Sequence, residues 1–196
     1  MTAEIYFVLK LVHILGVVFM SAPFYSLIIV NERALFSSTM NFPVDRYMEN
    51  LIKRQARRCF VFQSTVLISG ISLVNLSPGG FVSIFTDWVL ASKTIILLIL
   101  IGLLTYIHFA IQPKIENLLS SVRLNPIPKE ISDKIKPLRV VRKKLASLCL
   151  FFVLSAIILG MQVVVRLDIT LNVILFILAA IFSWRAYKLP LPFGWF

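Results

Sequence analysis

Acidic residues are scarce in this chain of 196 residues, which has nine Asp and Glu against 20 Lys and Arg. The acids fall in predicted loops or at the amino terminus, so a relay of carboxylates that carries protons through a membrane is excluded. The signatures of phosphate-binding loops, of GxSxG hydrolases and of HExxH metalloproteases are also missing. No catalytic pattern of a soluble enzyme is therefore present.

Cysteine and histidine are equally rare, with two of each. Cys59 and Cys149 lie near the predicted cytoplasmic ends of helices, where a structural disulfide is not expected, and without neighbouring histidines they do not form a zinc site. The net charge of +11 would suggest nucleic acid as a partner in a soluble protein. In a membrane protein the same charge marks cytoplasmic loops, so no nucleic-acid partner is expected.

Long apolar runs are what the chain has in abundance: 59% of the residues are hydrophobic and the mean hydropathy is +0.90. The runs are continuous, whereas a membrane barrel needs short segments of alternating polarity. We therefore predict an all-α fold, a polytopic transmembrane helical bundle that forms one integral membrane domain over residues 1–196. The five predicted spans cover residues 5–30, 59–76, 88–111, 146–165 and 171–187.

Basic residues give the predicted orientation. All Lys and Arg except Lys10, Lys93 and Arg166 fall on one side of this five-span arrangement. The positive-inside rule then places the amino terminus outside and the carboxyl terminus in the cytoplasm. The basic segments 31–58 and 112–145 keep helical patterns next to the spans, so helices two to four are expected to extend into the cytoplasm. Their basic faces would meet anionic lipid headgroups or, alternatively, a partner protein.

Three ionisable side chains lie inside the spans. Lys10 and His13 are three residues apart in the first span and share one helix face, and Lys93 lies in the third span. All three fall in one outer layer, roughly 8 to 12 Å deep, with Met161 of the fourth span near the same level. Such residues mark a functional site because burying them in hydrocarbon is costly. The alternatives are that each lysine extends to the outer headgroups and that His13 is a neutral histidine bonded to a neighbouring helix.

The second histidine, His108, is predicted near the cytoplasmic boundary. Its level differs from that of His13 by roughly 15 to 20 Å, so the two are not expected to bind one haem iron together. His13 alone, or His13 with Met161 or a neutral Lys93, remains a candidate ligand set.

The segment YFVLKLVHILGVVF, with its K-x-x-H pattern at Lys10 and His13, resembles the first helix of a group of small bacterial membrane proteins. The group comprises HemJ-type protoporphyrinogen oxidases, CopD-like copper-resistance membrane domains and uncharacterised relatives, and the layout of residues 5–165 is most similar to the uncharacterised ones. The segment WVLASK, from Trp88 to Lys93, is similar to a lysine-bearing helix of the HemJ-type proteins. The resemblance implies a bacterial inner membrane location and a b-type haem associated with His13 and Lys93.

Two functions follow as hypotheses. The first is a haem-associated or haem-pathway oxidoreductase with Lys10, His13 and Lys93 as catalytic residues, His13 as the iron ligand and Met161 as a second cofactor-binding residue. Its partners would be membrane lipid and a porphyrin or haem. The alternative is a non-enzymatic accessory or assembly subunit with a membrane-protein partner, or a copper-related component. Copper is the weaker version because Met20, Met161, Cys59 and Cys149 are not expected at one depth.

Overall fold

The computed structural model describes residues 2–32, 41–122 and 126–188, and every regular element in this part of the chain is helical. Five of these helices are long and apolar enough to cross a membrane, as predicted. In the most apolar stretch of the first, third and fifth spans only 11% of the residues are buried inside the protein. The rest of that apolar surface is covered only if lipid surrounds the bundle, so the chain is a multi-pass membrane protein.

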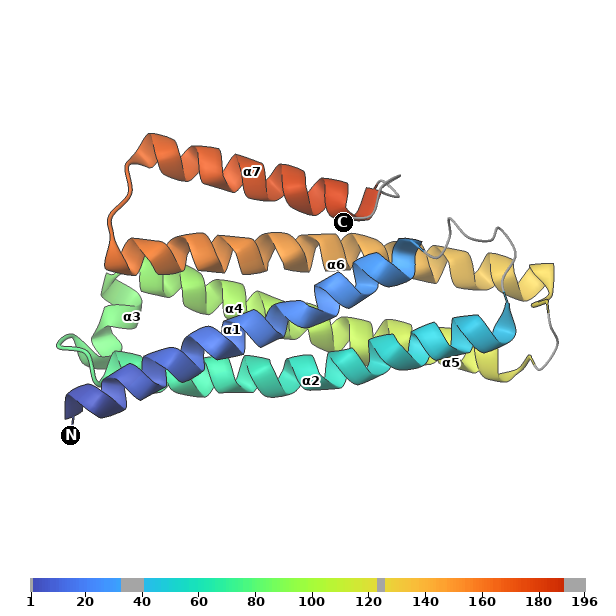
Figure 1. Cartoon of the computed structure of the whole chain (residues 1–196), viewed down its shortest axis with the longest axis horizontal. Coiled ribbons are helices and arrows are strands. Elements are labelled where there is room, and N and C mark those ends of the chain that lie inside the picture. The colour runs from blue at the N-terminus through green and yellow to red at the C-terminus, as the bar shows by residue number, and fades with distance from the viewer. Residues whose placement is uncertain (1, 33–40, 123–125, 189–196) are drawn as a thin grey trace.

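The first two spans are helices α1 (Thr2–Glu32) and α2 (Phe42–Asn75), which run antiparallel and cross along much of their length (Figure 1). Pro23 lies inside α1, as the sequence predicted. Helix α2 begins well before the predicted second span at residue 59. Asn41 caps its amino terminus, and Pro43 occupies the first turn, where a missing N–H costs no hydrogen bond.

The third span departs most from its prediction. After a short turn of 3-10 helix (η2, Gly80–Val82) and one turn of helix (α3, Ser83–Thr86), helix α4 (Trp88–Tyr106) passes through a π turn (η3, Ile107–Ile111) into α5 (Gln112–Ser120). The predicted third span ends at residue 111, and α5 is the extension expected from the helical pattern of the basic segment that follows. Pro113 stands in the first turn of α5, where its missing N–H costs no intrahelical hydrogen bond.

The last two spans are α6 (Lys129–Val164) and α7 (Ile169–Lys188), joined by a tight turn as predicted. Helix α6 begins at Lys129, well before the predicted fourth span at residue 146, and contains Pro137. Helix α7 packs against α6 at the side of the bundle and runs beside only part of its length (Figure 1).

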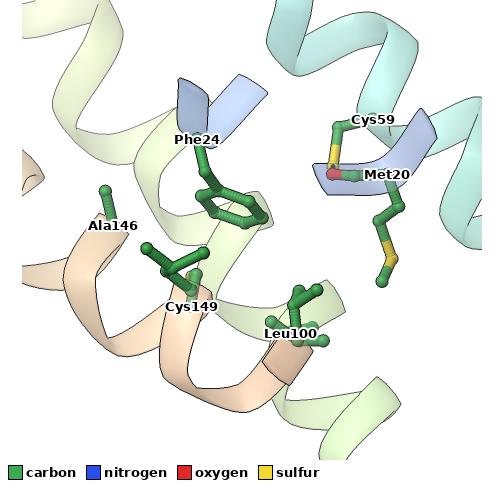
Figure 2. Close-up of a cluster of buried hydrophobic side chains, with 8 residues drawn as sticks. Met20, Phe24, Cys59, Leu100, Ala146 and Cys149 are labelled. Atoms are coloured by element: carbon green, nitrogen blue, oxygen red, sulfur yellow. Dashed lines mark hydrogen bonds between the residues drawn. The ribbon is translucent and has the colours of Figure 1, made fainter. Parts of the chain in front are cut away.

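Two apolar cores hold the helices together. The central core joins α1, α2, α4 and α6. Figure 2 shows this cluster and labels Met20, Phe24, Cys59, Leu100, Ala146 and Cys149. A second core lies where α2, α5 and α6 extend beyond the apolar spans, and it consists of Ile111, Ile115, Leu119, Val122, Ile127 and Ile135. The extensions are therefore packed parts of the fold.

Candidate functional site

His13 lies in the seam between α1 and α2, with its Nδ1 3.0 Å from the Oγ of Ser69. The proton of this serine hydroxyl is committed to the backbone carbonyl of Thr65, at 2.6 Å. The Ser69 oxygen must then accept, so Nδ1 of His13 carries the proton and donates it. In the neutral imidazole this fixes the tautomer and leaves Nε2 with a lone pair. A neutral histidine in this state can bind a metal or accept a proton.

Glycine makes room for this ring. A Cβ at Gly70 would lie 3.2 Å from Cε1 of His13, which is tighter than ordinary contact, so the ring occupies the space that the missing side chain leaves. One turn deeper in the same seam, a Cβ at Gly16 would lie 2.8 Å from Cγ2 of Val66. Helices α1 and α2 therefore approach closely around His13, and its ring has little freedom to turn.

Lys93 projects from α4 toward α6, where a Cβ at Gly160 would lie 3.7 Å from its Nζ. The structure thus places two of the predicted site residues on α1 and α4, and each is packed beside a glycine of a neighbouring helix.

The other two predicted residues lie at the surface. Lys10 is exposed, and the side chain of Met161 is 53% exposed. Among the described residues no hydrogen bond or ion pair joins either of them to His13, and neither lines the cavities of about 240 and about 60 Å³ in the bundle. Their proposed roles in cofactor binding stay predictions without a structural contact.

His108 occupies the π turn η3, and its ring packs edge-on against Phe60 of α2 with ring centroids 5.6 Å apart. Phe60 and Ser69 are nine positions apart on α2, which separates the levels of the two histidines by about 14 Å. The imidazoles therefore cannot serve as the two axial ligands of one iron. Pi turns interrupt helices at functional sites more often than elsewhere, but Pro113 directly follows this one and accounts for it.

The sulfur-containing side chains named in the sequence analysis do not all lie together. Met20, Cys59 and Cys149 share the central core, whereas Met161 is 53% exposed. The thiol of Cys59 donates to the backbone carbonyl of Met20 at 3.6 Å. Both cysteines are free and buried, and within the described residues no three His, Cys, Asp or Glu side chains are grouped to hold a metal ion.

The largest polar feature was not predicted. Asp45 and Glu49 of α2 are only 1% and 4% exposed, although the sequence analysis assigned both to loops. Together with Gln112 of α5 and with Arg139 and Arg142 of α6 they form what we call the acid–arginine network. Two carboxylates and two guanidiniums balance in charge, which is the condition for burying them.

Glu49 is the centre of this network. Nε and Nη2 of Arg139 donate to its Oε1 at 3.0 and 2.9 Å, and Nη2 of Arg142 donates to the same oxygen at 3.0 Å. Nη1 of Arg142 and the amide of Gln112 donate to its Oε2, the latter at 3.1 Å. Arg139 also binds Oδ1 of Asp45 at 2.9 Å. Three helices are thereby joined at one carboxylate.

A signal for this network was present in the sequence. Asp45 and Glu49 are four residues apart and Arg139 and Arg142 are three apart, so each pair shares one helix face. What concealed it was the assignment of Asp45 and Glu49 to loops and the assumption that basic residues beside a span face lipid headgroups.

Comparison with protein-family models, with curated proteins and with solved structures finds no match to this chain.

Proposed function

We propose that this chain is a haem-associated membrane protein in which His13 binds the iron through Nε2. The observation that carries the proposal is the hydrogen bond from Nδ1 of His13 to Ser69, because a second bond of this kind is how proteins orient a metal-binding imidazole. The ring is only partly buried, so its remaining nitrogen can be approached from the surface of the bundle.

Lys93 supplies the complementary charge. A haem or porphyrin carries propionate groups, and the ammonium of Lys93 is suited to bind one of them or another anionic substrate. When bound, haem would supply the electron-transfer chemistry, while the chain would orient it and offset its charge. The resemblance of the first helix to HemJ-type proteins supports the same conclusion. By the distribution of basic residues we also infer an external amino terminus in a bacterial inner membrane.

The absorbance spectrum of the purified protein tests this proposal. The chain is expressed in cells supplied with a haem precursor, solubilised in mild detergent and examined for a Soret band. We expect the band in the wild type and in His108→Ala, and its loss in His13→Ala. The two variants are matched, since each removes one of the chain's two imidazoles. A wild-type protein that stays colourless after haem is added would refute the proposal.

Ser69 is proposed as a positioning residue for His13. Removing its hydroxyl in Ser69→Ala should weaken haem binding by about tenfold or more, the usual effect of losing the partner of a metal-bound histidine. The reduction potential of the bound haem should shift as well, which a change in overall stability would not produce. Ser72→Ala is the control, because its hydroxyl bonds only to the backbone of its own helix, at the Ile68 carbonyl.

A second function is favoured by the acid–arginine network. This network and the second apolar core stiffen helix ends that extend beyond the apolar spans, which is what an accessory subunit needs to present a fixed surface to a larger membrane complex. Purification from the native membrane distinguishes the two functions. A stoichiometric protein partner without a bound cofactor would support the accessory function and exclude the haem-associated one.

A further inference from the structure

Helices α6 and α7 enclose an open groove of about 240 Å³ on the side of the bundle. One wall is formed by Lys144, Leu148 and Phe151 of α6, which recur at intervals of three and four residues on one helix face. The other wall is formed by Ala180 and Trp184 of α7. The groove exists because Ala180 leaves a gap between its larger neighbours.

The floor of the groove is closed by polar contacts. The hydroxyl of Ser147 donates to the backbone carbonyl of Ser183 at 2.7 Å and ties the two helices together. Ser183 is 2% exposed, and its own hydroxyl has no hydrogen-bond partner within the part of the chain that the structure describes. The groove therefore contains one buried polar atom whose partner has to come from elsewhere.

The two ends of the groove differ in character. Lys144 lies just before the apolar stretch of α6 begins, and Trp184 lies near the end of the apolar stretch of α7, so both mark the membrane boundary. From there Leu148, Phe151 and Ala180 line the groove toward the middle of the membrane. The groove thus has a cationic, aromatic mouth at the boundary and an apolar body below it.

Positive charge at the mouth is not balanced. Arg185 is exposed next to Trp184, and neither Arg185 nor Lys144 forms an ion pair with any acid in the described ranges. The nearest basic residues along α6, Arg139 and Arg142, are in contrast bound to Asp45 and Glu49. The ligand of the groove must bring its own negative charge.

We propose that the groove binds one anionic phospholipid. The phosphate lies at Lys144, one acyl chain lies along Leu148, Phe151 and Ala180, and the hydroxyl of Ser183 bonds to an oxygen near the glycerol. The boundary position, the unbalanced charge and the apolar body all match this amphiphile. A second copy of the chain is a poor occupant, because a two-fold contact places the same face of both copies together and would oppose their unpaired cations.

Native mass spectrometry of the full chain in mild detergent tests the headgroup. Phosphatidylglycerol and phosphatidylcholine are titrated separately, and we expect phosphatidylglycerol to bind more tightly. Lys144→Gln should weaken phosphatidylglycerol about fivefold, as expected for one cation at a membrane surface, and leave phosphatidylcholine unchanged. Lys134→Gln is the matched control, since Lys134 is exposed on the same helix outside the groove. Equal effects of the two substitutions would overturn the proposal.

A second pair of variants tests the apolar body. Ala180→Phe fills the groove from an exposed position and should lower the binding of both lipids, whereas Leu178→Phe, on a side chain that is 55% exposed outside the groove, should not. The buried cysteines report in each variant whether the fold is retained. Lipid binding that survives Ala180→Phe in a folded protein, displacement of the lipid by inorganic phosphate alone, or a dimer that Ala180→Phe dissociates would each overturn the proposal.

Discussion

Replacing Glu49 by alanine should be the most destabilising single change outside the apolar cores. The substitution removes both acceptor oxygens that hold Arg142, whose guanidinium is buried at 3% exposure, and leaves that charge without its carboxylate. Breaking a buried ion pair by removing one partner costs about 3 to 5 kcal/mol. The pair formed by Lys53 and Glu116 provides the control, because its side chains are 37% and 42% exposed. Glu116→Ala should cost about 1 kcal/mol or less.

Equilibrium unfolding in mixed micelles with increasing sodium dodecyl sulfate measures these costs. The two buried cysteines serve as the probe, since a thiol-reactive dye reaches them only after the helices separate. The double variant Glu49→Leu with Arg142→Met should recover most of the loss, because it replaces the buried pair by apolar groups and Arg139 keeps its bond to Asp45. Should Glu49→Ala cost no more than Glu116→Ala, the network would not be a stabilising centre and the reasoning would fail.

Two further predictions use the same unfolding measurement, and a third uses thiol labelling of the folded protein. Gly16→Ala should destabilise the protein by about 1 to 3 kcal/mol, since its Cβ would lie 2.8 Å from Cγ2 of Val66. Adding Val66→Ala to the same chain should relieve most of that cost. A double variant whose loss of stability equals the sum of the two single losses would contradict this prediction. Asp87→Ala should cost about 1 kcal/mol because the cap of α4 loses a 2.8 Å bond to a backbone N–H, whereas Asp87→Asn should cost little, and equal losses would argue against capping. Cys59 and Cys149 should not react with maleimide in the folded protein, and rapid labelling without denaturant would show that the central core opens.

The five spans were predictable because each is a long apolar run, and such a run is recognised even when the ends of the helix are placed a few residues away. The helix ends outside the membrane were not. Pro113 and Pro137 lie outside the predicted spans; Pro113 stands in the first turn of α5, and Pro137 is accommodated within α6. Proline position relative to a helix start, which the sequence leaves open, decides between these outcomes.

The apolar runs also made part of the candidate site predictable. A charge or imidazole within an apolar run is visible without coordinates, so His13 and Lys93 stood out. Their partners did not, because Ser69, Gly70 and Gly160 are ordinary residues in helix sequences. Which of them faces His13 or Lys93 depends on the rotation and crossing of helices, and no periodicity reports that.

The eight buried members of the central core come from α1, α2, α4 and α6, and α7 packs the partly buried Phe182 and Ala186 against them. Translation delivers those four segments before Ile169 is made, so the interior of the protein can close while the last helix is still being synthesised. The fifth span would then pack against a bundle of four helices that has already formed, and a chain that stops after Val165 should still insert and fold.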